Sequence, residues 1–206
     1  MVLGDNIFYG NGLFGLMNIA INAAEAGKVT VFGFYVKDPE RYGVVEFNVD
    51  GRVLSVEEKP KAPKSNYAIT GLYFYHAGVS AKAKAVKPSA RGELEITTLN
   101  DNYLKEDLLN VKLMGRGFAW LDTGTMESFL KASNFISMIE EQHGVMISAP
   151  EEIAYRYKWI RKNELLESAN KYGKSPYGEH LKSVAEGKMH KFKLVPLFKY
   201  ESRLAK

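Results

Sequence analysis

One stretch of this chain, residues 43–60, restricts the possible folds more than any other. Residues 43–47 and 52–59 both contain β-branched valines, and Asn48-Val49-Asp50-Gly51 between them carries the Asp-Gly pair of a tight turn. Pro60 lacks a backbone N–H and therefore ends the second run. The pattern predicts an antiparallel hairpin, so any sheet in this protein must be at least partly antiparallel.

Strand and helix patterns alternate on both sides of this hairpin. Residues 1–4 have the continuous apolar character of a central parallel strand, residues 13–26 predict a helix, and residues 28–36 predict a strand. Strand, helix and strand over this length indicate a βαβ unit with a parallel pair. We also expect strands at 67–75, 108–114, 118–121 and 145–149, and helices at 80–86, 92–104, 125–142, from 150, 163–172 and 176–186. The sequence predicts an α/β fold with a mixed sheet.

The composition changes near residue 126, from mixed sheet to mostly helix. We expect residues 1–125 to form one part, 126–187 a helical C-terminal region, and 188–206 a basic tail. In the helix at 125–142, Phe129, Ala132, Ile136 and Ile139 recur at spacings of three and four, which is typical of a packing face. Phe and Tyr interleave with the basic residues of the tail, and a solvated or loosely docked terminus is favoured there over a nucleic-acid patch.

Composition excludes several classes of site. The chain has 206 residues and no cysteine, so it has no disulfides or thiolate metal sites. Its four histidines show no metal-ligand spacing. The net charge of +4 suits an anionic small substrate as well as nucleic acid. No apolar run is long enough to span a bilayer. We expect a cytoplasmic protein with no nucleic-acid or membrane partner.

Two aspartates stand at the ends of predicted strands. Asp122 follows residues 118–121 and precedes a turn at Thr123-Gly124, and Asp5 follows residues 1–4. Carboxylates at strand ends face the crevice where open α/β sheets bind ligands, and two together can hold one Mg²⁺ against phosphate oxygens. A single strand-ending aspartate is ordinarily turn chemistry. The metal-site prediction therefore requires that the two aspartates meet.

Other residues suggest a site for a phosphorylated sugar. Alternation along the strand turns Glu58 away from Glu57 and Lys59. A solvated strand end is the common fate of such residues, and the functional interpretation is a clamp in which Lys59 meets a phosphate and Glu58 accepts from sugar hydroxyls. Arg91, before a predicted helix, can add a phosphate contact. Trp120 is either core or the wall of a sugar site.

The segment Gly10-Asn11-Gly12-Leu13-Phe14-Gly15 matches the dinucleotide-binding pattern G-x-G-x-x-G. Five residues separate it from Gly4, and the next acidic residue at a strand end comes later than that pattern requires. We interpret it as a glycine-rich loop that leads into a helix. An NAD-dependent Rossmann enzyme is the last-ranked alternative.

These residues lie in segments that together resemble the bacterial glucose-1-phosphate thymidylyltransferases, in the family's order: 2–8, 38–47, 57–60, 65–75, 91–97 and 115–125. The resemblance implies part of a nucleotide-diphospho-sugar transferase (Rossmann-like) fold. It also implies a Mg²⁺-dependent reaction of dTTP with glucose 1-phosphate, giving dTDP-glucose and pyrophosphate for dTDP-rhamnose-type biosynthesis. The family forms homo-oligomers, commonly tetramers.

The resemblance also assigns roles to individual residues. Asp5 and Asp122 match the two magnesium ligands, and Lys59 and Arg91 match residues that meet the sugar phosphate. The residues that would hold the sugar or line its pocket are Tyr42, Gly43, Glu58, Ile69, Tyr73 and Trp120. A second, regulatory nucleotide site near subunit contacts is matched by Arg116, Glu152 and Arg156.

The chain departs from the family before Asp5. The family opens with a strand and a loop, Gly-Gly-x-Gly-Thr-Arg-Leu, whose amides and arginine bind the triphosphate, and this N-terminal nucleotide-binding third has no counterpart here. We therefore expect this chain alone to turn over poorly or not at all. Two alternatives stay open: another sugar-1-phosphate nucleotidyltransferase, such as a uridylyltransferase, and a non-catalytic sugar-phosphate-binding or assembly fragment.

Overall fold

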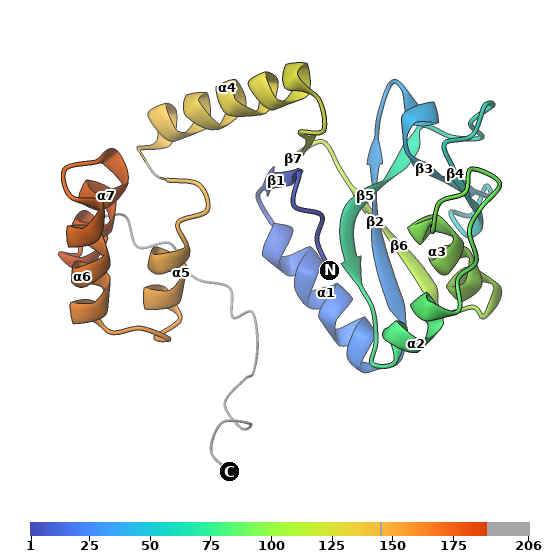
Figure 1. Cartoon of the computed structure of the whole chain (residues 1–206), viewed down its shortest axis with the longest axis horizontal. Helices are drawn as coiled ribbons and strands as arrows, with labels where there is room; N and C mark the ends of the chain where they lie inside the picture. Colours follow the sequence, from blue (N-terminus) through green and yellow to red (C-terminus); the bar gives the residue numbers. More distant parts are fainter. Residues whose placement is uncertain (145, 189–206) are drawn as a thin grey trace, which may run out of the picture. The chain divides into compact units, whose positions relative to one another are not determined.

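The computed structural model describes residues 1–144 and 146–188, which form two compact units (Figure 1). The first unit is Met1–Gly124 and contains all the strands of the described residues. The second unit begins at Thr125 and is helical in its described part. The expectation of an α/β fold followed by a helical region is confirmed. Within the described residues, no helix is both long enough and apolar enough to cross a membrane.

The main sheet has five strands in the order β4-β3-β5-β2-β6. The predicted hairpin is confirmed, because β3 and β4 pair antiparallel with Val45 opposite Val56. β2 pairs antiparallel with β5 and parallel with β6, which makes the sheet mixed. The strand bounds are Val29–Tyr35 (β2), Gly43–Phe47 (β3), Val53–Glu58 (β4), Tyr67–Phe74 (β5) and Leu109–Met114 (β6).

A separate two-stranded sheet pairs β1 (Asn6–Gly10) antiparallel with β7 (Phe118–Asp122). The prediction of a buried parallel strand at residues 1–4 is wrong. Those residues make an isolated bridge, Val2 to Leu72, and the side chain of Met1 is 60% exposed. The predicted parallel pairing across the first βαβ unit is also wrong, because β1 pairs with β7, and the parallel pair is β2 with β6. Apolar character alone did not distinguish a central strand from an exposed segment bonded to one neighbour.

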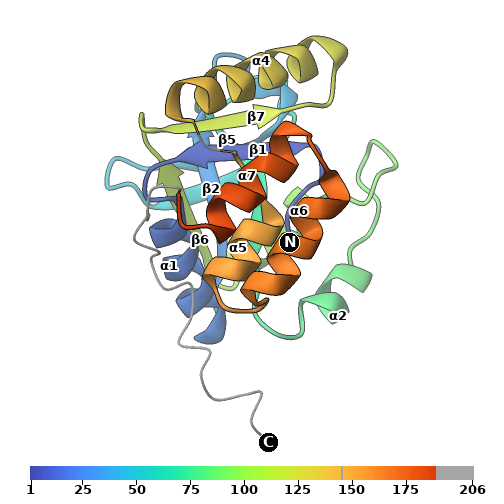
Figure 2. The same cartoon turned by 90° about the vertical axis from the view of Figure 1, so that its left-hand side faces the viewer.

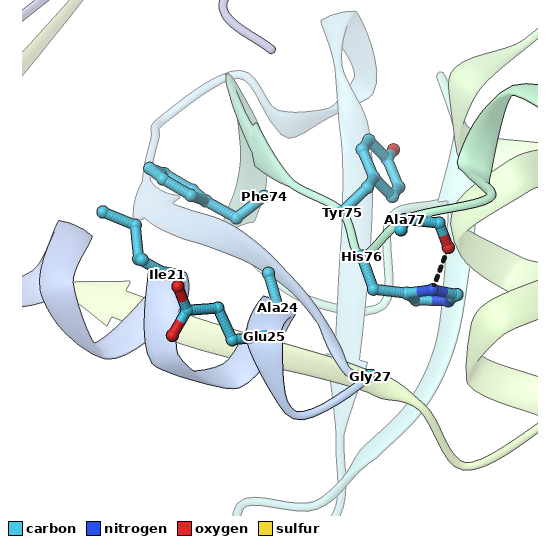
Figure 3. Close-up of a pocket in the computed structure, with 8 residues that line it drawn as sticks. All are labelled: Ile21, Ala24, Glu25, Gly27, Phe74, Tyr75, His76 and Ala77. Carbon is cyan, nitrogen blue, oxygen red and sulfur yellow. Dashed lines mark hydrogen bonds between the residues drawn. The ribbon is translucent and has the colours of Figure 1, made fainter. Parts of the chain in front are cut away.

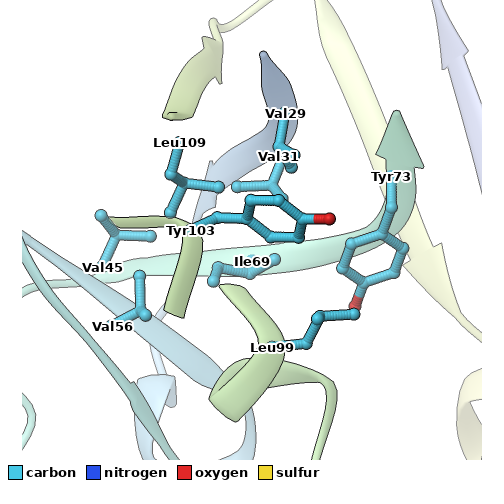
Figure 4. Packing of buried hydrophobic residues seen from close by; sticks show 9 residues of the cluster. All are labelled: Val29, Val31, Val45, Val56, Ile69, Tyr73, Leu99, Tyr103 and Leu109. Carbon is cyan, nitrogen blue, oxygen red and sulfur yellow. The ribbon is translucent and has the colours of Figure 1, made fainter. Parts of the chain in front are cut away.

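Helices cover both faces of the main sheet (Figure 1). Helix α1 (Leu13–Glu25) packs Ala20 against Phe32 and Leu72 on one face. Helix α3 (Ile96–Lys105) packs Leu99 and Tyr103 against the other face, together with the short α2 (Val79–Lys84) (Figure 4). Adjacent strand residues such as Val31 and Phe32 point to opposite faces, so a run of apolar residues in β2 supplies both cores. Each fully buried apolar side chain contributes about 1.5–3 kcal/mol.

The helical unit contains α4 (Met126–His143), α5 (Pro150–Arg156), α6 (Lys162–Tyr172) and α7 (Pro176–Ala185), with α5, α6 and α7 side by side (Figure 2). Thr125 caps α4 by accepting from the backbone N–H of Ser128 at 3.1 Å. Residues 146–149 form no strand, because Ala149 instead caps the helix that begins at Pro150. Of the predicted packing face on α4, Ala132 is buried but Phe129 is 57% exposed. The tail prediction falls, after Lys188, outside the described residues.

Candidate functional site

The antiparallel pairing of β1 and β7 brings the two predicted aspartates together. Asp5 directly precedes β1, and Asp122 is the last residue of β7. The backbone N–H and the hydroxyl of Thr123 donate to the carbonyl oxygen of Asp5 at 2.8 and 2.9 Å. A Cβ atom added to Gly124 would lie 3.3 Å from Asp122 Oδ1 and 3.9 Å from Asp5 Oδ2. Both carboxylates therefore face the same glycine. Asp5 starts a strand rather than ending one, and the two acids meet because the strands run in opposite directions.

This pair fits the way proteins hold magnesium. Asp5 Oδ1 accepts from the Asn6 side chain at 2.8 Å, and Asp122 Oδ1 accepts from the Gly124 N–H at 3.1 Å. These bonds orient the carboxylates, and among the described residues no donor meets either Oδ2 atom. The described residues contain no cluster of three or more His, Cys, Asp or Glu that could form an all-protein metal cage. Mg²⁺ typically takes one or two carboxylates and completes its shell with water and substrate phosphates.

Asn6 is a central residue of the site to which the sequence interpretation gave no role. Its Oδ1 accepts from Trp120 Nε1 at 2.6 Å and from the Gly71 N–H at 3.1 Å, while its Nδ2 donates to Asp5. One side chain therefore joins β5 of the main sheet, the Trp120 ring and the Asp5 carboxylate. Gly71 is needed for this approach, because a Cβ atom there would lie 2.6 Å from Asn6 Oδ1. A glycine inside a strand can signal such a close approach, but it does not identify the partner.

Trp120 forms an aromatic wall beside the carboxylates. Its ring lies 5.1 Å from that of Tyr42 and 6.0 Å, edge-on, from that of Phe34. The guanidinium of Arg41 lies over the Tyr42 ring at 5.4 Å. Burial is the main cause of the raised pKa of Tyr42; the charge of Arg41 opposes this increase, and the charge of Asp122 adds to it. The half-buried Trp120 therefore belongs to a wall more than to a core.

A second group of predicted residues gathers around Glu58. Gly43 is paired with Glu58 across the hairpin, and a Cβ atom on Gly43 would lie 3.2 Å from Glu58 Oε2 and 2.9 Å from the hydroxyl of Thr97. The buried Thr97 donates to Glu58 Oε2, a partner that the sequence did not reveal. Burial, followed by the charge of Glu58, raises the pKa of Tyr73 to about 12. Ile69 completes the group at 3.9 Å from the Gly43 Cβ position.

The two predicted phosphate-binding cations lie at the edge of this group. Lys59 has a φ of +44°, its N–H donates to the Tyr42 carbonyl at 2.9 Å, and no described residue pairs with its ammonium. A non-glycine residue in the left-handed region stores strain, which is common at functional sites. Arg91 borders a hollow of about 320 Å³ that Glu58 and Thr97 also line. The bond from the Lys59 N–H to the Tyr42 carbonyl joins the end of β4 to the residue before β3, and neither of these two residues lines the hollow.

The predicted regulatory residues divide between the two units. Arg116 is exposed in the turn before β7, whereas Glu152 and Arg156 lie on α5. Glu152 bonds Arg156 Nε at 2.5 Å and meets His180 Nε2 at 2.6 Å, and both acid and arginine are largely buried. The contact with His180 joins α5 to α7. The regulatory role of the three residues stays a prediction.

The glycine-rich motif lacks the setting that a dinucleotide site requires. Gly10 ends β1 and α1 opens at Leu13, but β1 pairs antiparallel with β7 and belongs to no parallel βαβ unit. A second hollow, of about 500 Å³, lies between the end of α1 and the end of β5 (Figure 3). It is lined by Glu25, His76 and mainly apolar neighbours, and by none of the candidate residues.

Curated proteins with similar sequences carry the same name, glucose-1-phosphate thymidylyltransferase. The chain is 50% identical over 191 residues to a glucose-1-phosphate thymidylyltransferase of Xanthomonas campestris pv. campestris (strain B100), covering 92% of this chain and 64% of the relative. It is 47% identical over 186 residues to that of Mycobacterium tuberculosis (strain CDC 1551 / Oshkosh), covering 90% of this chain and 64% of the relative. The chain thus spans less than two thirds of the length of these curated relatives.

Solved structures confirm the fold. A Bacillus anthracis protein described as a glucose-1-phosphate thymidylyltransferase, in complex with sucrose, is 40% identical with a TM-score of 0.55, over 65% of this chain and 52% of that one. A UDP-glucose pyrophosphorylase bound to UDP-glucose has a TM-score of 0.57 at 20% identity, over 66% of this chain and 55% of that one, which supports the fold alone. The expectation of part of a nucleotide-diphospho-sugar transferase fold is therefore confirmed.

A family-wide sequence model agrees with these relatives. It describes the nucleotidyl transferases and matches residues 1–138, which include the carboxylate pair, the Glu58 group and the aromatic wall. Because this match covers well over half of the chain, and the relatives at about 50% identity carry thymidylyltransferase names, the resemblance is confirmed and the chain belongs to the nucleotidyl transferase family.

Proposed function

We propose that this chain supplies the sugar-phosphate and metal-binding part of a glucose-1-phosphate thymidylyltransferase. The observation that carries this proposal is the meeting of Asp5 and Asp122 at one end of the β1–β7 pair, beside the Trp120 wall. Relatives that are 50% and 47% identical to this chain are named glucose-1-phosphate thymidylyltransferase. The transfer from dTTP to glucose 1-phosphate is proposed for the whole enzyme, because the chain covers 64% of those relatives.

The proposed roles follow from the position of each group. Lys59 and Arg91 bind the phosphate of glucose 1-phosphate, and Glu58, held by Thr97, accepts from the sugar hydroxyls. Tyr42 and Trp120 exclude water from one side of the sugar. A phosphate oxygen of glucose 1-phosphate then attacks the α-phosphorus of dTTP, the bond from that phosphorus to the bridging oxygen breaks, and pyrophosphate leaves. The attacking oxygen is already anionic, so the residues mainly position and neutralise charge.

We propose Mg²⁺ as the cofactor of the intact enzyme. Asp5 and Asp122 would hold it, and it would supply positive charge to the phosphate oxygens. We further propose that the intact enzyme is a cytoplasmic homo-oligomer, a tetramer as in the resembling family, that serves dTDP-rhamnose-type biosynthesis. The uridylyl alternative is supported only by a likeness of fold, at 20% identity.

Calorimetric titration of this chain with glucose 1-phosphate tests the half-site. We expect binding that Lys59→Met weakens about ten-fold, through loss of a charge-assisted contact, and that Lys61→Met, an exposed neighbour, leaves unchanged. Asp122→Asn should remove Mg²⁺ binding while the circular dichroism spectrum stays the same. Equal effects of the two lysine variants would contradict the proposed phosphate site.

Turnover tests the rest of the proposal. An enzyme extended to the full length of the relatives should release pyrophosphate from dTTP faster than from UTP when glucose 1-phosphate is present. Preference for UTP would favour the uridylyl alternative. Sugar-phosphate binding without any turnover in the extended enzyme would favour the non-catalytic binding fragment.

A further inference from the structure

Arg91, the proposed phosphate contact, is surrounded by carboxylates. Its Nη1 lies 3.3 Å from Glu95 Oε1 and 3.9 Å from Glu58 Oε1, and its Nη2 lies 3.2 Å from Glu93 Oε2. A phosphate that approaches this guanidinium must therefore compete with at least one of these acids. The three acids differ in burial and bonding, and these differences indicate which contact is exchanged.

Glu95 is fixed in place. Its side chain is only 10% exposed, and its Oε1 accepts from the hydroxyl of Ser89 at 3.1 Å as well as from Arg91. The same Ser89 hydroxyl accepts from the backbone N–H of Arg91 at 3.1 Å. Ser89 thus connects the backbone of Arg91 to the acid that holds its side chain. Both Glu93 and Glu95 lie before α3, which begins at Ile96 and not at residue 92 as predicted, so they belong to the loop that presents Arg91.

Glu93 is held only loosely. Its side chain is 61% exposed, and its described side-chain contact is the single ion pair with Arg91 Nη2. Its backbone, in contrast, is anchored, because its carbonyl accepts from the N–H of Ser89 at 2.8 Å. An exposed ion pair of this kind is weak, so an incoming anion can replace it at little cost.

We propose that Glu95 and Glu93 act on Arg91 in opposite directions: Glu95 is a positioning residue that aims the guanidinium at the hollow, and Glu93 occupies Nη2 until the sugar phosphate replaces it. This inference rests on the proposed function, because it assumes that Arg91 receives the phosphate. On binding, one carboxylate contact is exchanged for one phosphate contact, so Arg91 is never left without a counter-charge. Glu93 therefore lowers the affinity for sugar phosphate and Glu95 raises it.

The test is the dissociation constant of glucose 1-phosphate, measured by calorimetry on this chain at low ionic strength. Glu93→Gln should bind about two- to five-fold more tightly, the range expected for release of a surface ion pair. Glu95→Gln should bind roughly five- to ten-fold more weakly, because a partly buried charged hydrogen bond that orients Arg91 is weakened. Glucose, which has no phosphate, should show neither change.

Glu57→Gln is the matched control. Glu57 is exposed and lines the same hollow, but it makes no described bond to Arg91. The Glu57→Gln variant therefore measures only the increase in affinity that comes from removing one negative charge near the phosphate. Its gain should be less than half that of Glu93→Gln. In an Arg91→Gln background, Glu93→Gln should increase the affinity for glucose 1-phosphate by no more than Glu57→Gln does.

The outcomes separate this inference from the proposed function. If the wild-type chain binds glucose 1-phosphate but Glu93→Gln and Glu57→Gln give equal gains, the exchange at Nη2 is refuted while the proposed function stands. Changes in the same direction for Glu93→Gln and Glu95→Gln would refute the division of roles. If the wild-type chain does not bind glucose 1-phosphate, the proposed half-site and this inference both fail.

Discussion

Replacement of Gly71 by alanine should disconnect the Asn6 side chain from the rest of the site. The added Cβ atom would lie 2.6, 2.7 and 2.9 Å from Oδ1, Cγ and Nδ2 of Asn6. Ordinary contacts between such atoms need about 3.5 Å, so the carboxamide must move by about 1 Å. The Asn6 bonds to Trp120 Nε1, now 2.6 Å, and to the Gly71 N–H, now 3.1 Å, would then be lost or distorted.

The expected cost is about 1–3 kcal/mol of unfolding free energy. Each distorted hydrogen bond costs about 0.5–1.5 kcal/mol, and the partly buried donors left without an acceptor add to this. Alanine opposes the loss, because in a strand it is favoured over glycine by about 0.5–1 kcal/mol. The φ angle of Gly71 lies outside the left-handed region, so the backbone itself accepts alanine.

Urea unfolding followed by tryptophan fluorescence measures this cost. The chain has two tryptophans, and Trp159→Phe removes the exposed one, so that Trp120 reports on the site directly. Asn6→Ala should itself destabilise by about 1–3 kcal/mol through the same lost bonds. The double variant Gly71→Ala with Asn6→Ala should then be no less stable than Asn6→Ala alone, because the clash has no partner.

Additive effects in this double-mutant cycle would refute the reasoning. Additivity means that the Gly71 Cβ position and the Asn6 carboxamide do not share the same space, whereas residues in direct contact couple by about 0.5–3 kcal/mol. A Gly71→Ala protein as stable as wild type, with an unchanged Trp120 emission maximum, would have the same meaning.

Three further predictions concern the sugar-phosphate group. Thr97→Val should keep the fold but weaken glucose 1-phosphate binding about three- to ten-fold by calorimetry, because Glu58 loses its orienting donor. Lys59→Gly should relieve the backbone strain at φ +44°, so the free energy of unfolding should stay the same or rise by up to about 1 kcal/mol. The affinity for glucose 1-phosphate should fall in the same variant. A loss of stability together with the loss of affinity would contradict this prediction. Burial raises the pKa of folded Tyr73 to about 12 from an unfolded value of 10.0. The contribution of this phenol to the free energy of unfolding is therefore fully present below pH 10, and that free energy should fall by about 2–3 kcal/mol as the pH rises to 12. Tyr73→Phe should flatten that part of the stability–pH curve.

Local sequence patterns were sufficient for elements whose geometry depends on neighbouring residues. The Asp-Gly pair predicted the antiparallel β3–β4 hairpin, whereas the register shift between Glu46 and Phe47 has no signal in the turn residues. The helix at α1 and the strand at β5 are likewise set by local pattern. Local pattern failed for residues 1–4, where apolar character was compatible with a central strand or with an exposed segment.

The candidate site was predicted in part for the same reason. Glu58 and Lys59 stand together at the recognisable end of one strand, so their nearness followed from adjacency in the chain, although alternation predicts that their side chains point to opposite faces. Thr97 and Asn6 gave no comparable signal, because a threonine or asparagine gains its role only from the partner that folding supplies. Thr97 is 39 residues from Glu58, and Asn6 is 114 residues from Trp120.

By itself, the sequence determined the alternation of strands and helices, the antiparallel hairpin and the identity of the charged groups at the strand ends. The tertiary structure alone decided that β1 pairs antiparallel with β7, and therefore that Asp5 and Asp122 face the same glycine. The physical reason is that strand pairing between distant segments depends on backbone hydrogen bonds and close packing across the sheet, which no local pattern of residues records.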